Sequence, residues 1–376
     1  MKDVLGIGVI GCGVISKAYL ERARTFSPIS FVAVSDRDEA AARRQADAFG
    51  VEAMSPDALL AREDVDIVLN LTPPTAHAAV STAALEAGKH VYSEKPFVLD
   101  PATGRALLHL AASKRLRLGS APDTFLGGSH QLARHLVDAG AIGRIVSGTC
   151  FVMNHGMEDW HPSPDFFYQP GGGPLFDLGP YYIANLVQLL GPIRRVSAQS
   201  ATAHPTRRIG FGPRIGEDIP VEVPTTVQAL LGFASGAAIM FAVSWDVWQH
   251  DIAPMALYGE TGTLHVPDPN FFGGAVRLTR GAEEVPVPDW DHPFSKTNSC
   301  NSKGPVADFR AAGLADMAQA IIEERAHRCG DAFALHVIDV LCAIDRAASE
   351  DTVVQVASGA DRPEALDGQA ARTLMA

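Results

Sequence analysis

The segment at residues 4–16 constrains the fold of this chain most strongly. An apolar run at residues 4–10 leads directly into the glycine-rich segment Gly11-Cys12-Gly13-Val14-Ile15-Ser16. This order predicts a strand, a tight turn and a helix start, the arrangement that holds the pyrophosphate of a dinucleotide on free helix N–H groups. Gly11 permits the turn, Gly13 lets the backbone approach the phosphates, and small Ser16 allows helix and strand to pack closely. We therefore expect cofactor contacts from Gly11, Gly13, Val14 and Ile15.

An acidic residue follows at the distance that this motif requires. Residues 29–34 form a second strand-like run, which ends at Ser35-Asp36-Arg37-Asp38. Asp36 lies about 20 residues beyond the glycine turn, where a carboxylate accepts hydrogen bonds from an adenosine ribose. Asp36 would repel a 2′-phosphate and favours NAD, whereas Arg37 beside it offers a partner to the 2′-phosphate of NADP. The sequence favours NAD and leaves NADP open.

Length, charge and cysteine usage limit the class of protein. A chain of 376 residues is too long for one compact core and is expected to form two domains. The formal net charge of −12 argues against non-specific binding to nucleic acid or to an anionic membrane surface. The five cysteines are scattered without metal-ligand spacing, which favours buried reduced thiols in a cytoplasmic protein. We expect no signal peptide, since the first strand starts at once, and no membrane span.

The chain divides into three segments by pattern. Residues 1–122 alternate strand-like and helix-like runs, which predicts an α/β Rossmann domain with a doubly wound parallel sheet. Residues 123–356 carry long strand-like runs separated by glycine turns, which predicts an α+β domain with a mostly antiparallel sheet. Within this domain we expect helices over 175–190 and 306–324 and a loop over 281–305. Residues 357–376 are polar and are predicted to form a partly disordered tail.

Two further motifs carry residues suited to chemistry. Glu94-Lys95-Pro96 follows the fourth predicted strand, at the edge where open α/β sheets bind ligands, and a lysine there favours a developing alkoxide. A glycine run at 171–173, which would let the chain pass close to a ligand, precedes a helical segment that contains Asp177 and Tyr181. These two residues are four apart and would share one helix face. A solvated loop lysine, and a capping acid beside a core tyrosine, stay open as alternatives on the pattern alone.

Together these segments resemble the glucose–fructose oxidoreductase / inositol dehydrogenase / rhizopine-catabolism (Gfo/Idh/MocA) family. The resemblance covers most of the chain and rests on the glycine turn, Thr72-Pro73-Pro74 with His77, Glu94-Lys95-Pro96 and residues 173–179. It implies a Rossmann domain, a substrate-binding domain whose open sheet often forms the oligomer contact, a nicotinamide cofactor and a sugar or polyol substrate. By position, Lys95 and Asp177 resemble the family's active-site lysine and aspartate. The resemblance adds the following residues to those expected at the cofactor: Thr72, Pro73, His77, Glu94 and Lys95.

Position 181 departs from the family pattern, in which a histidine follows the aspartate by four residues. Tyrosine stands there, and the reference pKa of tyrosine, near 10, makes it a poor base at neutral pH unless a cation favours the phenolate. We expect Tyr181 to exchange the substrate proton, while Lys95 favours its ionised form and Asp177 orients the substrate hydroxyl. The rival base is His161, because imidazole exchanges protons near neutral pH.

The loop before the glycine run is the expected substrate contact. It interleaves aromatic residues with acids and histidines, which suits the apolar faces and hydroxyls of a sugar. Trp160 and His161 are the best candidates in this loop, and Arg310, His327 and Arg328 rank lower. The predicted substrate site as a whole consists of Lys95, Trp160, His161, Tyr168, Asp177 and Tyr181.

The expected activity is that of an NAD(P)-dependent oxidoreductase that moves a hydride between nicotinamide and a hydroxyl-bearing carbon of a sugar, glycoside or polyol. No metal is expected, because no HExxH or clustered ligand spacing is present. The resemblance leaves two alternatives: a glycosidase that retains its cofactor and acts by transient oxidation, and a catalytically silent NAD(P)-sensing protein. We expect a homodimer or homotetramer with a small-molecule substrate and with neither a nucleic-acid nor a membrane partner. The sugar, the oxidised carbon and the direction stay open.

Overall fold

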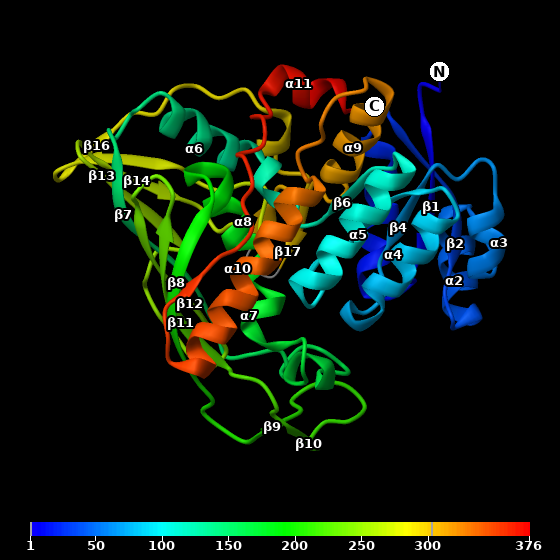
Figure 1. Cartoon of the computed structure of the whole chain (residues 1–376), viewed down its shortest axis with the longest axis horizontal. Helices are drawn as coiled ribbons and strands as arrows, with labels where there is room; N and C mark the ends of the chain where they lie inside the picture. The colour runs from blue at the N-terminus through cyan, green and yellow to red at the C-terminus, as the bar shows by residue number, and fades with distance from the viewer. Residues whose placement is uncertain (1, 302–303) are drawn as a thin grey trace.

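The apolar run at the N-terminus forms the strand β1 (Leu5–Ile10), and all six of its residues are buried. The computed structural model describes residues 2–301 and 304–376. In it, β1 lies inside a six-stranded sheet of order β3-β2-β1-β4-β5-β6, whose strand pairs are all parallel (Figure 1). The other strands are β2 (Ile29–Ser35), β3 (Glu52–Ala53), β4 (Ile67–Asn70), β5 (His90–Ser93) and β6 (Leu118–Ser120). This is the doubly wound sheet that the alternating pattern predicts.

Helices connect these strands, and polar residues cap several of them. Asp38 accepts a hydrogen bond from the Ala40 N–H at the start of one helix, and Asp100 does the same for Thr103 at another. The helices are α1 (Val14–Arg22), α2 (Glu39–Phe49), α3 (Pro56–Ala61), α4 (His77–Glu86) and α5 (Pro101–Lys114). Because the strand order reverses between β1 and β4, the carboxyl ends of these two strands border the crevice where such sheets bind ligands.

The second domain is built on a nine-stranded sheet of order β16-β15-β14-β13-β7-β12-β11-β8-β19. β7 and β12 are parallel, and the other strand pairs of this sheet are antiparallel. Its strands are β7 (Ile145–Met153), β8 (Ile193–Ala201), β11 (Thr226–Phe233), β12 (Ala238–Ser244), β13 (Met255–Gly259), β14 (Thr263–Val266), β15 (Arg277–Arg280), β16 (Glu283–Val285) and β19 (Val354–Gln355). Two hairpins lie outside it: β9 (Thr206–Arg208) with β10 (Asp218–Pro220), and β17 (Ser299–Asn301) with β18 (Gly304–Val306).

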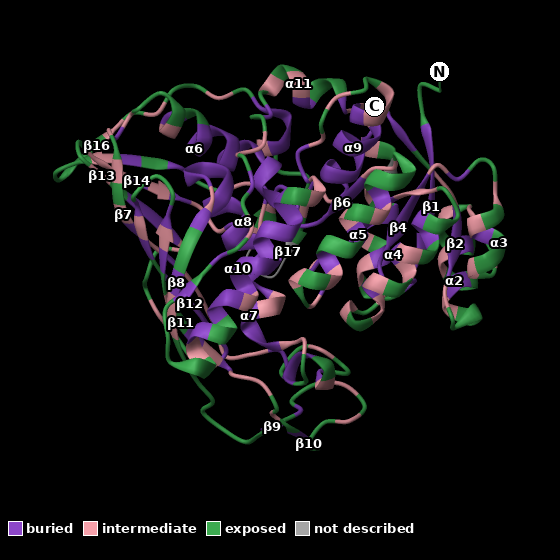
Figure 2. Cartoon of the chain, viewed as in Figure 1, coloured by how far each residue is buried: buried purple, intermediate pink, exposed green. Residues whose placement is uncertain are grey.

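Helices cover one face of this large sheet. The longer helices of the domain are α6 (Gly128–Asp138), α7 (Gly173–Asp177), α8 (Gly179–Leu190), α9 (Ala312–Ile322), α10 (Asp331–Glu350) and α11 (Gly368–Thr373). The second domain also contains the short 3-10 turns η3 (Thr124–Leu126), η4 (Asp165–Tyr168) and η5 (Pro293–Ser295), and the first domain contains η1 (Ala23–Thr25) and η2 (Pro74–Ala76). All residues of α8 are buried, and α10 packs on β8 and α8 and also on α5 of the first domain. The buried core in Figure 2 is therefore continuous between the domains.

The structure corrects four local predictions. The C-terminal residues 357–376 are ordered, because Leu366 and Leu374 are buried and Met375 bridges to Phe26 beside the first domain. The predicted helix over 306–324 starts only at Ala312, since residues 304–306 pair as a strand, and the predicted loop over 281–305 holds short strands. The predicted helix over 175–190 is divided at residue 178, because Pro180 has no N–H to continue the hydrogen-bond ladder.

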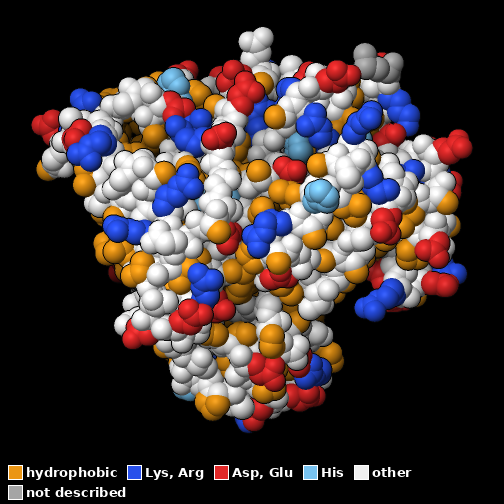
Figure 3. Space-filling view, in the orientation of Figure 1, with side chains coloured by type: hydrophobic (Ala, Val, Ile, Leu, Met, Phe, Trp, Pro, Cys, Tyr) orange, Lys and Arg blue, Asp and Glu red, His pale blue; other side chains and the backbone are white. Residues whose placement is uncertain are grey.

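On the face shown in Figure 3, basic and acidic side chains are interspersed and form no continuous basic field. Within residues 2–301 and 304–376, no helix combines the length and apolar character that a membrane crossing requires.

Candidate active site

The glycine turn forms as predicted at the carboxyl end of β1. Gly11 has a φ of +107°, and a Cβ there would lie 2.5 Å from the backbone carbon of Leu71, so only glycine fits. A Cβ at Gly13 would meet nothing within 4 Å, and apolar Val14 is 81% exposed at the first position of α1. Buried Ser16 donates its hydroxyl to the Gly13 carbonyl. The turn therefore leaves open space in front of the free N–H groups of α1, which fits the pyrophosphate of a dinucleotide.

Asp36 is held against this turn by backbone hydrogen bonds. Its Oδ2 accepts from the Cys12 N–H at 2.7 Å, and its Oδ1 accepts from the Asp38 N–H at 2.8 Å. The carboxylate is half-buried at the end of β2, while Arg37 beside it is exposed. This is the position that a ribose-binding carboxylate takes, so the residues fit NAD.

Buried His77 joins the loop after β4 to the loop after β5. Its Nδ1 lies 2.7 Å from the Pro96 carbonyl oxygen, and its Nε2 lies 2.8 Å from the Thr72 carbonyl oxygen. Burial lowers the pKa of His77 in spite of these two acceptors. Both ring nitrogens thus lie within hydrogen-bond distance of backbone carbonyl oxygens, and His77 joins the loop that carries Lys95 to the loop that holds Thr72.

Lys95 and Asp177 meet between the two domains. The Lys95 ammonium donates to Asp177 Oδ1 at 2.6 Å and to the Asp177 carbonyl oxygen at 2.7 Å, and the two side chains are 15% and 20% exposed. The same ammonium lies 5.3 Å from the centre of the Tyr181 ring. Burial alone would lower the pKa of Lys95, but the negative charge of Asp177 raises it, so the lysine is a cation. The three residues that the sequence placed in one site are therefore brought together.

A second cation lies near the hydroxyl of Tyr181. Arg310, between β18 and α9, has its Nη1 3.5 Å from the Tyr181 hydroxyl and 3.4 Å from Glu94 Oε1. Glu94 also accepts from the Tyr19 hydroxyl of α1 at 2.8 Å. Buried Asp123 accepts from the Gly313 N–H, and burial raises its pKa to about 6. The sequence ranked Arg310 low and missed Asp123, because nothing in the local pattern around them indicates a shared cluster.

The loop at residues 154–172 carries the predicted substrate contacts. His161 stacks edge-on against Trp160, Phe166 and Phe167, and Trp160 is 56% exposed. Burial lowers the pKa of His161, although Asp177 counteracts this. The loop reaches the Lys95 side of the site, since Gly171 packs against Leu99. Trp160 and Phe166 thus form the exposed edge of an aromatic cluster, and half-buried His161 in this cluster lies close enough to Asp177 to feel its charge.

Tyr168 has a different environment from its neighbours in this loop. It is fully buried, its hydroxyl bonds to Glu158, and its ring packs on Trp245. The structure thus gives it no surface for a substrate and assigns it to the packing beneath the loop. His327 and Arg328 also lie elsewhere: His327 bonds to the Leu118 carbonyl, and Arg328 is paired with the buried carboxylate of Asp316.

The glycines at residues 171–173 were predicted to allow a close approach to a ligand, but at Gly172 the close approach is to the chain itself. A Cβ at Gly172 would lie 2.6 Å from the carbonyl oxygens of Phe166 and Phe167, and Gly173 has a φ of +77°. The close approach at Gly172 is therefore to the aromatic loop of the chain itself. It brings that loop directly against the start of α7, whose last residue is Asp177.

A buried ion-pair network anchors the aromatic loop to the second sheet. Arg207 of β9 donates to Glu158 Oε1 at 2.9 Å and to the Trp245 carbonyl, and it pairs with Asp246. The side chains of Arg207 and Glu158 are only 5% and 4% exposed. Asp246 in turn accepts from the hydroxyls of Thr225 and Thr226. One arginine thus joins the loop, the β9–β10 hairpin and the strand ends of the sheet.

The site combines a dinucleotide cradle with a lysine, a carboxylate and a phenol at the carboxyl edge of the sheet. Among the described residues, no three His, Cys, Asp or Glu side chains are grouped to hold a metal ion. The arrangement is that of an NAD-dependent oxidoreductase, in which the protein contributes binding, orientation and charge.

The comparisons with known proteins agree with this class. Residues 5–121 match the family model described as "Oxidoreductase family, NAD-binding Rossmann fold", and residues 130–265 match the "GFO/IDH/MocA C-terminal domain". The chain is 34% identical over 245 residues to the dTDP-3,4-didehydro-2,6-dideoxy-alpha-D-glucose 3-reductase of Streptomyces violaceoruber, an alignment that covers 64% of this chain and 69% of that protein. The chain belongs to the Gfo/Idh/MocA oxidoreductase family, which confirms the resemblance inferred from its motifs.

Two further matches concern one enzyme. The chain is 29% identical to the levoglucosan dehydrogenase of Pseudarthrobacter phenanthrenivorans, with 62% of this chain and 65% of that protein covered. A solved structure of a levoglucosan dehydrogenase in complex with NADH and L-sorbose has a TM-score of 0.80 and 21% identity, and it covers 95% of this chain and 100% of that one. The structural match shows that the fold is shared over almost the whole chain.

The network around Arg207 gives a stability prediction. Arg207→Met leaves the buried carboxylates of Glu158 and Asp246 without their cation, which lowers the free energy of unfolding by about 3–5 kcal/mol. The matched control is Arg208→Met, since the neighbouring Arg208 pairs with Asp218 at the surface and contributes about 1 kcal/mol or less. Urea denaturation of both variants measures the difference. Equal, small effects of the two substitutions would contradict the anchoring role of Arg207.

Proposed function

We propose that this oxidoreductase acts on a hydroxyl-bearing carbon of a sugar, glycoside or polyol, with Tyr181 as the group that exchanges the hydroxyl proton. One observation carries the proposal: the Lys95–Asp177 pair and the Tyr181 ring lie together at the sheet edge that holds the dinucleotide cradle. The cation, the carboxylate and the phenol are the groups needed to orient an alcohol and to move its proton.

Each residue has a separate task in the proposed mechanism. When bound, NAD supplies a hydride acceptor, and its reduced form supplies a donor. In oxidation the substrate hydroxyl gives its proton to the Tyr181 oxygen while its carbon becomes a carbonyl, and in reduction the same proton returns from Tyr181. Lys95 stabilises negative charge on the substrate oxygen, and Asp177 orients the hydroxyl while it holds the ammonium in place.

Two observations support a carbohydrate substrate. The exposed aromatic edge at Trp160 and Phe166, beside His161, offers apolar faces and a polar partner within one cluster. The relatives named above are a sugar reductase and a levoglucosan dehydrogenase, and an inositol 2-dehydrogenase from Rhizobium meliloti is 31% identical over 138 residues. His161 then contacts substrate hydroxyls, which leaves the proton exchange to Tyr181.

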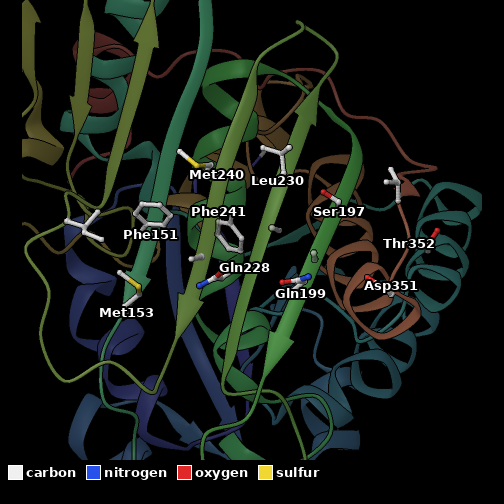
Figure 4. A pocket seen from close by; sticks show the side chains of 15 residues that line it. Phe151, Met153, Ser197, Gln199, Gln228, Leu230, Met240, Phe241, Asp351 and Thr352 are labelled. Atoms are coloured by element: carbon white, nitrogen blue, oxygen red, sulfur yellow. The ribbon is translucent and has the colours of Figure 1, made fainter.

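The open face of the nine-stranded sheet supports a homo-oligomer. It holds a hollow of about 650 Å³ lined by Phe151, Met153, Leu230 and Met240 among others (Figure 4). Leu230 and Met240 face each other across β11 and β12 and are 49% and 52% exposed. Polar side chains such as Gln199 and Gln228 also line the hollow, and exposed apolar residues on a sheet face of this kind are what a second copy of the chain would cover. The buried thiols Cys12, Cys150 and Cys329, which form no disulfide, support a cytoplasmic location.

A substrate screen tests the proposed activity. We expect the absorbance of the reduced nicotinamide to change with at least one member of a panel of free sugars, glycosides, nucleotide-linked sugars and polyols. A cofactor that co-purifies and returns unchanged after a glycoside is cleaved would indicate the glycosidase alternative. Cofactor binding without turnover on the whole panel would indicate a sensing protein and overturn the proposal.

Substitution of the two rival bases separates their roles. Tyr181→Phe removes the proton-exchanging hydroxyl and is expected to lower kcat by about 10²–10⁴-fold. His161→Asn keeps a polar side chain in the aromatic cluster and is expected to raise KM more than it lowers kcat. Steady-state kinetics on the substrate found by the screen measure both. Near-normal turnover of Tyr181→Phe, with a collapse in His161→Asn, would transfer the role to His161.

Charged substitutions on the open face of the nine-stranded sheet test whether this face is the oligomer contact. The double variant Leu230→Glu with Met240→Glu places two carboxylates in the hollow and is expected to convert the oligomer to a monomer. The matched control is Ile215→Glu, which puts the same charge on a residue that is 67% exposed near the β9–β10 hairpin. Light scattering on each purified variant reports the mass. An unchanged oligomer in the double variant would exclude this face as the contact.

A further inference from the structure

Two cations flank Tyr181, and they contact different parts of its side chain. The Lys95 ammonium lies over the face of the ring, 5.3 Å from its centre. Arg310 Nη1 lies 3.5 Å from the hydroxyl oxygen, the atom that gains and loses the proton. A cation at the oxygen stabilises the negative charge of a phenolate directly, whereas a cation over the ring acts mainly on its π-electrons.

The partners of the two cations strengthen this distinction. Lys95 makes two short bonds to Asp177, one to the carboxylate and one to the backbone carbonyl, so two of its three N–H groups are directed at Asp177 and not at the phenol oxygen. Arg310 makes longer contacts, 3.4 Å to Glu94 and 3.5 Å to Tyr181. Its side chain is 15% exposed, and that of Glu94 is 7% exposed. The guanidinium is therefore a mostly buried cation whose charge is only partly balanced by Glu94. It lies beside the phenol oxygen, where the low local dielectric strengthens its effect.

The backbone around Arg310 holds it in this place. The Arg310 N–H donates to Asp308 Oδ1, and the other oxygen of Asp308 pairs with Arg22 of α1 at 3.2 Å. Ala311, directly after Arg310, is fully buried with a φ of +84° and turns the chain into α9. The position of the guanidinium is thus tied both to α1, the helix of the dinucleotide cradle, and to the second domain.

We propose that Arg310 is the positioning residue that favours the ionised form of Tyr181, by donating a hydrogen bond from Nη1 to the phenol oxygen when the proton leaves. The proposal rests on the assignment of proton exchange to Tyr181. In oxidation the Tyr181 O–H bond forms from the substrate proton and the charge on the phenol oxygen disappears, and in reduction the O–H bond breaks and Arg310 meets the returning charge. Arg310 itself keeps all its protons, because its pKa is raised by Tyr181 and Glu94, which outweigh the effect of burial.

Several charged or titratable groups face this pair and bear on its pH dependence. They are Lys95, Asp177, Glu94, Tyr19 and Asp123, together with His161, which interacts with Asp177. Burial raises the pKa of Asp123 to about 6, so it titrates on the acidic side of the profile. Burial also raises the pKa of Tyr19 well above its ordinary value, so its titration lies beyond the alkaline range of interest. Arg310 lowers the pKa of Asp123, so its removal shifts the Asp123 titration upward too, and the direct titration of tyrosinate described below is what assigns a shift to Tyr181.

The test compares Arg310→Met, Arg310→Lys and the control Tyr19→Phe. Arg310→Met is expected to lower kcat about 10–100-fold with little change in KM, and to move the pH at which the oxidation rate rises upward by about one unit. Arg310→Lys restores a cation and recovers part of both effects. Tyr19→Phe removes a different partner of Glu94, 2.8 Å away, and leaves the pH profile in place. Equal losses in Arg310→Met and Tyr19→Phe without a pH shift would show that Arg310 only supports Glu94.

Two further measurements keep the proposal separate from the acid/base assignment. Ultraviolet difference titration compares each protein with its Tyr181→Phe variant, and tyrosinate is expected to form at higher pH once Arg310 is changed to methionine; this readout needs no turnover. In a Tyr181→Phe background, Arg310→Met is expected to lower kcat no further, because the two residues act as one unit. Full additivity of the two losses would overturn the role of Arg310. Normal turnover of Tyr181→Phe alone would overturn the acid/base assignment instead.

Discussion

The ion pair between Lys95 and Asp177 is the interaction on which the site depends, because its two members come from different domains. Lys95 follows β5 of the parallel sheet, and Asp177 ends α7 of the second domain. A pair buried to this degree gains little net stability, since desolvation of both charges offsets their attraction. Loss of one partner, however, leaves a buried charge. The pair therefore acts chiefly as a local constraint: within the docking that the continuous core between the domains maintains, it holds Asp177 beside Lys95, and the phenol of Tyr181 lies beside the same ammonium at the sheet edge that carries the dinucleotide cradle.

The parts of this site that the sequence predicted are those governed by local geometry. The turn at Gly11 and Gly13 follows from backbone sterics over a few residues, and Asp36 follows from the length of one strand–helix–strand unit. The doubly wound sheet follows from alternation along the chain. Lys95 was placed correctly because parallel strands end at a common edge. Such features need no knowledge of what packs against them.

The parts that were missed depend on contacts between segments far apart in the chain. Tyr168 was predicted to contact a sugar because it lies in the aromatic loop and carries both a ring and a hydroxyl. Its hydroxyl instead bonds to Glu158, and its ring packs on Trp245 in a buried cluster. Arg310 lies 129 positions from Tyr181 in the sequence, and only the fold brings them together. The tail was predicted to be partly disordered because it is polar on average. Its few apolar residues, such as Leu366, nevertheless reach a buried position.

The same local constraint bears on the tyrosine at position 181, where the family pattern has a histidine. Tyr181 contacts Lys95 through its ring and Arg310 through its hydroxyl but forms no ion pair with a carboxylate, so a histidine or a tyrosine at this position leaves no buried carboxylate without its cation. A change at Lys95, Asp177 or Glu94 would leave a buried charge without its partner. A phenol loses its proton less readily than an imidazolium does, so it needs positive charge at its oxygen to do the same work. The chemistry at this position can therefore change while the charged frame around it stays the same.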